Sequence, residues 1–207
     1  MIRIKCCGIT RVDDALLAAR LGADAIGLVF TARSPRRVML QQAQAIVRAL
    51  PPFVTSVALF MDDDAAWVRQ VVDAVQPTLL QFHGGESGAW CTQVGRPFLK
   101  ALALGEGALA MAEFDAYPHA AGLLLDGHVR GAAGGGGRRF DWSLPLPMTT
   151  QPLVLAGGLH ADNVAAAIAA LHPWGVDVAS GVESAPGIKS ADKLAAFVRA
   201  VRAADAA

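Results

Sequence analysis

The chain has 207 residues, 54% of them hydrophobic, and its 18 basic residues balance its 18 acidic residues. This length and apolar content predict a globular protein. The balanced charge argues against a broad surface for nucleic acid or for an anionic membrane, although it leaves room for a local anion site. The three cysteines have no Cys-x-x-Cys spacing, which favours neither a disulfide framework nor a zinc ribbon.

The first residues carry no apolar signal region, and no run of about 18 mostly apolar residues is free of charges and helix breakers. We therefore expect a cytoplasmic protein with reduced thiols and no membrane segment. The composition leaves both a monomer and a homodimer open.

Apolar segments typical of strands alternate along the chain with segments of helical spacing. Each strand and its return helix together take about 20 to 25 residues. The predicted strands are 2–7, 23–30, 54–60, 79–82, 98–103, 121–125, 153–156 and 175–178. The predicted helices are 12–21, 41–50, 62–75, 87–94, 108–114, 162–171 and 189–204.

Eight such units in sequence predict an α/β protein, a single-domain (β/α)8 TIM barrel over residues 1–207. An open, doubly wound sheet is the alternative. We favour the barrel because polar residues recur at or just past the strand ends, where a closed ring would bring them together. These residues are Cys7, Arg36, Gln81, His83, Asp126 and Asp177.

The first strand ends in a glycine turn that is expected to present a functional side chain. Alternation places Cys6 on the face toward the helices and places Lys5 and Cys7 on the inward face. Gly8 permits a sharp exit, and Thr10 is a candidate cap for the next helix. Cys7 would then lie at the barrel mouth that binds ligands, although a free cysteine is more often a small buried hydrophobe.

Two glycine turns follow the last two predicted strands and suggest a phosphate site. Gly157-Gly158 and Ser180-Gly181 offer backbone N–H groups without large side chains, at the strand ends where barrels often hold phosphate. The alternative is that these glycines only turn the chain.

Cys7 and Asp126 form a candidate acid–base pair on opposite parts of the ring. A thiol with a pKa near 8.5 is a usable base only if nearby basic groups lower that pKa. Asp126 has an alternative role as a helix cap or as a partner of Lys5.

Arg36 is a candidate ligand for a carboxylate, because a guanidinium fork matches that group. Arg33 and Arg37 compete with it for this role. His83 shares a strand face with Gln81 and either points into the same pocket or makes hydrogen bonds at its rim. No His, Asp or Glu cluster has metal-ligand spacing, so we expect no metal. Residues 134–137 (GGGG) are interpreted as a closing loop.

Several motifs occur in the order found in one known family. They are residues 5–10 (KCCGIT), 34–36 (SPR), 81–84 (QFHG), 125–126 (LD), 140–142 (FDW), 155–159 (LAGGL) with 163–164 (NV), and 175–183 (GVDVASGVE). Over essentially the whole chain the sequence resembles the phosphoribosylanthranilate isomerases of tryptophan biosynthesis. It departs from the family pattern at Cys6, Gly127, Gly136 and Ala179.

The resemblance implies a barrel without cofactor or metal that acts on a small phosphosugar, N-(5-phosphoribosyl)anthranilate, by an Amadori rearrangement. It implies that Asp126 protonates the furanose ring oxygen and that Cys7 removes the C2′ proton. It also implies a carboxylate site at Arg36, a phosphate site at Gly157, Gly158, Ser180 and Gly181, and a pocket lined by Asp177. From its strand face, His83 is expected to be a further substrate-binding residue.

Two other functions stay open. One is a phosphosugar-binding barrel without catalysis, and the other is a related phosphosugar isomerase of broader specificity. The joint presence of Cys7, Arg36 and Asp126 argues against a binder, since binding alone does not require an acid–base pair.

Overall fold

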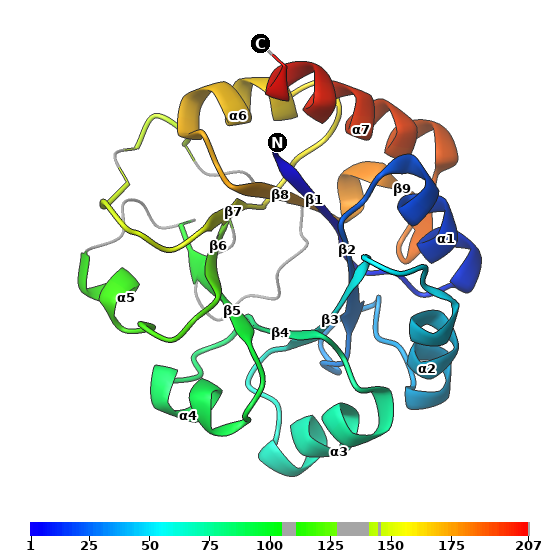
Figure 1. The fold of residues 1–207 in the computed structure, drawn as a ribbon, viewed down its shortest axis with the longest axis vertical. Helices are drawn as coiled ribbons and strands as arrows, with labels where there is room; N and C mark the ends of the chain where they lie inside the picture. The colour runs from blue at the N-terminus through cyan, green and yellow to red at the C-terminus, as the bar shows by residue number, and fades with distance from the viewer. Residues whose placement is uncertain (105–110, 128–140, 145, 207) are drawn as a thin grey trace.

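The computed structural model describes residues 1–104, 111–127, 141–144 and 146–206. Eight parallel strands follow one another in chain order and close into a barrel, which confirms the predicted (β/α)8 fold. Helices surround the ring of strands (Figure 1). The strands are β1 (Arg3–Cys6), β2 (Ala25–Val29), β3 (Thr55–Phe60), β4 (Leu79–Phe82), β5 (Phe98–Ala103), β6 (Gly122–Asp126), β7 (Leu153–Leu155) and β8 (Gly175–Val178).

Side-chain caps begin α3, α4 and α7. Asp64 accepts hydrogen bonds from the first backbone N–H groups of α3, and the Ser87 and Ser190 side chains cap α4 and α7 in the same way. Between β6 and β7 the described residues contain no helix. The helices are α1 (Val12–Leu21), α2 (Leu40–Ala49), α3 (Ala65–Val75), α4 (Gly88–Gln93), α5 (Met111–Asp115), α6 (Val164–Leu171) and α7 (Ala191–Asp205).

Two local predictions near the ends of the chain are wrong. The last helix does not start at Lys189, because the turn at Gly187 folds β9 (Glu183–Ala185) and β10 (Ile188–Lys189) into an antiparallel hairpin. Thr10 does not cap α1; its hydroxyl donates a 2.6 Å hydrogen bond to the carbonyl of Gly187 in that hairpin. The chain after β1 is therefore tied to the chain after β8.

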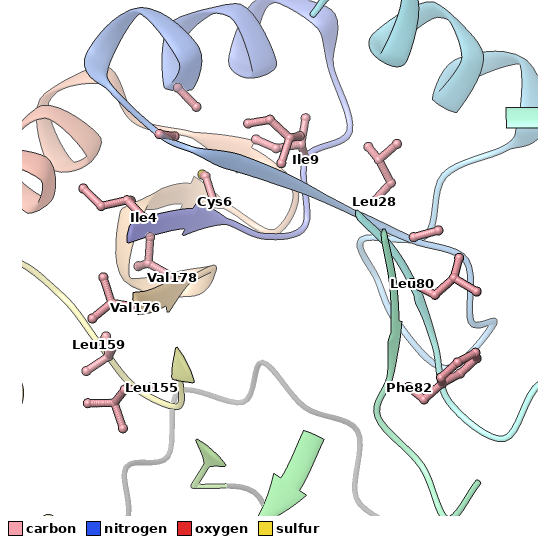
Figure 2. Close-up of a cluster of buried hydrophobic side chains, with 14 of the residues drawn as sticks. Ile4, Cys6, Ile9, Leu28, Leu80, Phe82, Leu155, Leu159, Val176 and Val178 are labelled. Atoms are coloured by element: carbon pink, nitrogen blue, oxygen red, sulfur yellow. The ribbon is translucent and has the colours of Figure 1, made fainter. Parts of the chain in front are cut away.

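The main hydrophobic core lies between the barrel and its helices. Figure 2 shows part of this layer, with Ile4 and Cys6 of β1 beside Val176 and Val178 of β8. Cys6 is fully buried there, as strand alternation predicts, and burial raises the pKa of its thiol to about 12. Cys7 points the other way and packs in a separate small cluster inside the barrel mouth.

The barrel interior is apolar in one layer and polar in another. Ala101, Leu124, Val154 and Ala156 fill the apolar layer. The polar layer near the strand ends holds mostly buried polar and charged side chains, which need partners inside the barrel because their burial removes most of their contact with water. Its members include Lys5, Gln81, Asp126 and Asp177.

The remaining expectations concern membranes and the glycine loop. In the described parts of the chain, no helix combines the length and apolar character needed to cross a bilayer. Residues 134–137, and with them Gly136, lie outside the described residues.

Candidate active site

A pocket opens at the carboxyl ends of the barrel strands, the rim where the sequence analysis expects ligands. Gly181 is the one predicted site residue that does not line it. The predicted residues that do line it are Cys7, Arg36, His83, Asp126, Gly157, Gly158, Asp177 and Ser180.

The order of the strands arranges these residues around the rim. Asp126 ends β6, and the glycine pair follows β7. The turn at Ser180 follows β8, Cys7 follows β1, and Arg36 lies in the loop after β2. The two glycine turns therefore lie between the acid and the thiol, and the arginine lies on the other side of the thiol.

Cys7 is buried next to an ion pair inside the barrel. Lys5 donates a 2.9 Å hydrogen bond to Asp177 on the neighbouring strand. Burial alone would lower the pKa of Lys5, but the charges of Asp177 and Cys7 raise it above its ordinary value, so Lys5 stays cationic. The partner of Lys5 is thus Asp177, not Asp126 as the sequence analysis considered.

The thiol of Cys7 experiences opposing effects. Burial raises its pKa, and the negative charge of Asp177 adds to that rise. The charge and hydrogen bond of Lys5 lower the pKa, as does the charge of Lys189, but burial prevails and the net direction is upward. The basic groups therefore limit the rise in this pKa but do not bring it below its ordinary value.

Gly27 makes room for this group of side chains, a role that the sequence analysis missed. A Cβ atom on Gly27 would lie 2.7 Å from Cys7 Sγ and 3.1 Å from Lys5 Nζ. Both distances are too short for normal packing, so only glycine fits at this position of β2 without a shift of the thiol. A glycine inside a predicted strand is the sequence signal for such a close approach.

Asp126 lies beside two polar side chains at the end of β4, Gln81 on the strand and His83 just after it. Its Oδ2 atom is 3.4 Å from Nε2 of His83. The Nδ1 atom of that ring is 3.1 Å from the amide nitrogen of Gln81, which is fully buried. With the amide donating to Nδ1, the ring carries its proton on Nε2, facing the carboxyl group.

Of the three arginines after β2, the structure brings only Arg36 into the pocket. Arg33 is half exposed and pairs with Asp62 at 3.5 Å, and Arg37 stacks on the ring of Trp67. Arg36 is mostly buried, and Glu183 accepts two short hydrogen bonds from it. These hydrogen bonds raise the pKa of Arg36, which keeps its charge at any ordinary pH.

The two glycine turns are adjacent and well braced. Gly157 and Gly158 have φ angles of 82° and 64°, in the left-handed region that favours glycine. The side chain of Asn163 donates a 2.9 Å hydrogen bond to the carbonyl of Gly158. A Cβ on Gly181 would meet the carbonyl oxygen of Leu159, so Gly181 serves the close contact between the two turns.

Glu183 and Lys189 also escaped the sequence analysis as site residues. Both are buried, and Lys189 donates to Glu183 and to the carbonyl of Cys7. The signal was the Pro186-Gly187 pair, which is typical of a turn and places the two residues on facing strands of a hairpin. Across residues 1–104, 111–127, 141–144 and 146–206, no group of three or more His, Cys, Asp or Glu could hold a metal ion.

Comparison with known proteins shows the family of this chain. The family model described as N-(5'-phosphoribosyl)anthranilate isomerase matches residues 4–200. The protein of that name from Pseudomonas paraeruginosa is 56% identical over 201 residues, which cover 97% of this chain and 95% of the relative. Phosphoribosyl anthranilate isomerase from Thermus thermophilus has a crystal structure with a TM-score of 0.87 and 41% identity, covering 98% of this chain and 99% of that chain.

Two further crystal structures bear on ligands and assembly. One is a phosphoribosyl anthranilate isomerase in complex with reduced 1-(o-carboxyphenylamino)-1-deoxyribulose 5-phosphate, with a TM-score of 0.81, 32% identity and coverage of 98% and 100%. The other shows monomers generated from the dimeric enzyme of Thermotoga maritima, with a TM-score of 0.82, 32% identity and coverage of 98% and 99%.

Proposed function

The chain belongs to the N-(5'-phosphoribosyl)anthranilate isomerase family, and we propose that Cys7 and Asp126 carry out the family's reaction in the pocket described above. The substrate is N-(5-phosphoribosyl)anthranilate, and the product is 1-(2-carboxyphenylamino)-1-deoxyribulose 5-phosphate. The reaction is an Amadori rearrangement in tryptophan biosynthesis.

The order of groups around the rim carries this proposal. The substrate has an anion at each end, a phosphate and a carboxylate, and its reacting carbons lie between them. The glycine turns after β7 and β8 offer Gly157, Gly158, Ser180 and Gly181 to the phosphate. Arg36 after β2 offers its guanidinium to the carboxylate. A substrate bound in this way passes Cys7, with Asp126, His83 and Asp177 also lining its site.

Asp126 acts as the general acid in this scheme. Its carboxyl group gives a proton to the furanose ring oxygen as the bond from that oxygen to C1′ breaks. The lone pair of the anthranilate nitrogen then forms a double bond to C1′, which leaves a positive iminium. His83, with its ring near the carboxyl group, holds Asp126 in place.

Cys7 acts as the general base in the second step. Its thiolate takes the proton from C2′, and the electrons of that C–H bond form the C1′–C2′ double bond and neutralise the iminium. The resulting enolamine tautomerises to the ketone product, so no atom is gained or lost. Lys5 supports this step because its charge stabilises the thiolate against burial.

The assembly and location of the protein are further parts of the proposal. We propose that residues 1–207 form one domain that works as a monomer or a homodimer in the cytoplasm. A dimer is supported by the relative described as dimeric. The cytoplasm is supported by the proposed chemistry, because Cys7 acts as a base only while its thiol is reduced.

The test is turnover of phosphoribosylanthranilate generated in the cuvette, followed by loss of its fluorescence without added metal or nucleotide. We expect rapid loss that depends on the protein. Folded, reduced protein that gives no loss would overturn the proposal and favour a phosphosugar-binding barrel. Equal turnover of a substrate without the carboxylate would favour an isomerase of broader specificity.

A further inference from the structure

Glu183 holds one edge of the Arg36 guanidinium. Its Oε1 atom accepts a 2.9 Å hydrogen bond from Nε, and its Oε2 atom accepts a 2.7 Å hydrogen bond from Nη2. Both residues are at least nine-tenths buried. This two-point contact fixes the plane of the guanidinium, which a single hydrogen bond would leave free to turn.

The same contact leaves the other edge of the guanidinium for a ligand. A guanidinium has five N–H donors, and Glu183 accepts from the Nε–Nη2 side. Arg36 lines the pocket. Among the described residues, none accepts a hydrogen bond from its Nη1 atom. The Nη1–Nη2 edge can therefore bind a carboxylate in the same forked way that the Nε–Nη2 edge binds Glu183.

Two groups of the β9–β10 hairpin donate hydrogen bonds to the carboxylate of Glu183. Lys189 donates a 2.8 Å hydrogen bond to Oε1, and the backbone N–H of Gly187 donates a weaker one at 3.2 Å. Lys189 also donates to the carbonyl of Cys7 at 2.7 Å. The hairpin thus connects the carboxylate that orients Arg36 to the backbone of the thiol residue.

Gly8 lies against the side chain of Arg36. A Cβ at this position would lie 2.5 Å from Cδ of Arg36, and the φ angle of Gly8 is 70°. The arginine stem therefore lies directly against the turn after β1.

Arg36, Lys189 and Glu183 together carry one net positive charge, which suits a single anionic partner.

We propose that Glu183 is a positioning residue that orients Arg36 and so sets the preference of the pocket for ligands with a carboxylate. It touches no substrate and acts only through the guanidinium. This inference rests on the proposed function, which brings the anthranilate carboxylate to Arg36.

The experiment measures binding of two ligands by calorimetry. The first is the reduced product analogue, which has the carboxylate, and the second is its phenylamino counterpart, which lacks it. The dissociation constant of the ligand without the carboxylate, divided by that of the ligand with it, is the ratio that measures carboxylate recognition. We expect Glu183→Gln to lower this ratio about tenfold, because the glutamine amide cannot accept hydrogen bonds at two points.

A double-mutant cycle tests whether Glu183 acts through Arg36. In an Arg36→Ala background, Glu183→Gln should leave the ratio unchanged. An additive loss in the double variant would overturn the proposal. So would tighter binding of the carboxylate ligand by Glu183→Gln alone, since that result means Glu183 merely competes with the ligand for the positive charge.

Two further variants separate positioning from stability. Asp14→Asn weakens the same hairpin, because Asp14 accepts from the backbone N–H of Lys189, but it does not touch Arg36. It should lower the melting temperature and leave the ligand ratio unchanged. If Glu183→Gln does not fold, Glu183→Asp keeps the charge, withdraws the carboxylate by one methylene, and should lower the ratio likewise.

The proposed function and this inference fail in different ways. Wild-type protein that binds both ligands equally would refute the carboxylate role of Arg36. Wild-type protein that prefers the carboxylate, combined with a Glu183→Gln variant that keeps the full preference, would refute only the role of Glu183.

Discussion

The ammonium group of Lys5 and the carboxylate of Asp177 are paired across the seam where the first and last strands close the barrel. The two residues are directly opposite in the β1–β8 register, and their hydrogen bond is 2.9 Å long. Both side chains are buried, and the charges of both act on the thiol of Cys7, in opposite directions. Closure of the barrel therefore sets the electrostatic environment of the proposed base.

This relationship predicts opposite effects from two substitutions. Lys5→Met removes a positive charge and a hydrogen bond from the thiolate, so the pKa of Cys7 should rise further. Asp177→Asn removes a negative charge, so the same pKa should fall. The ultraviolet absorbance of the thiolate, followed against pH with Cys7→Ala as the blank, measures both shifts.

The two variants control for each other, because each breaks the same buried ion pair. A loss of folding alone would move both titrations in the same direction. Shifts of the same sign would therefore show that Lys5 and Asp177 do not act on Cys7 through their charges.

A second prediction concerns the space at Gly27. Gly27→Ala would push a methyl group against Cys7 Sγ and Lys5 Nζ and displace the thiol. Since a displacement near 1 Å in a reacting group can cost about a hundredfold, we expect kcat/KM to fall by roughly that factor. The steady-state fluorescence assay measures kcat/KM.

Gly85→Ala is the matched control, because its methyl group would make only an ordinary 3.6 Å contact with Asp62. Equal activity of the two variants would contradict the role of Gly27.

The barrel could be predicted from the sequence because each strand and each helix is indicated by the pattern of neighbouring residues. Strand and helix periodicities alternate along the chain, and polar residues recur at the strand ends, as with His83 and Asp126. Once the ring closes, these ends meet at one rim whatever the detailed packing. This geometry brings Cys7 and Asp126 into one pocket.

The partners of the buried charges could not be predicted, because they depend on register between distant segments. Lys5 and Asp177 are 172 residues apart, and Arg36 and Glu183 are 147 apart. The sequence analysis considered Asp126 as a partner of Lys5, whereas the partner in the structure is Asp177. Only the β1–β8 register decides between them.

The hairpin of β9 and β10 was missed for a different reason. Ser190 and the residues after it have the capping group and spacing of a helix, and the prediction extended that helix back to Lys189. Gly187, with a φ angle of 79°, instead turns the chain into the hairpin. Thr10 was assigned to a cap by the same local logic, although its hydroxyl binds this turn.

A third prediction follows from the proposed acid and base. Cys7→Ala and Asp126→Asn should each lower kcat by about 10²- to 10⁴-fold, which is the usual contribution of general acid–base catalysis. Dissociation constants for the reduced product analogue should change little, because neither residue is proposed to hold the phosphate or the carboxylate. Stopped-flow turnover and calorimetry together separate the two effects. A variant that keeps near-normal kcat would lose its assigned role, and a variant that loses binding as much as turnover would point to a binding role instead.

A fourth prediction concerns stability in acid. Burial would raise the pKa of Glu183, but its hydrogen bonds and ion pairs with Arg36 and Lys189 prevail and hold the pKa below its ordinary value of 4.5. A carboxylate with a lowered pKa stabilises the fold fully above the unfolded-state value, and this stabilisation is lost as the pH falls through the folded-state pKa. The free energy of unfolding should therefore decrease as the pH falls below about 4.5, and the decrease should be shallower for Glu183→Gln.

Urea unfolding between pH 7 and pH 3 measures both slopes. Asp162→Asn, which changes an exposed carboxylate on the β7–α6 loop, is the control. Identical acid slopes for wild type and Glu183→Gln would mean that Glu183 titrates alike in the folded and unfolded chains, contrary to its buried pairing with Arg36 and Lys189.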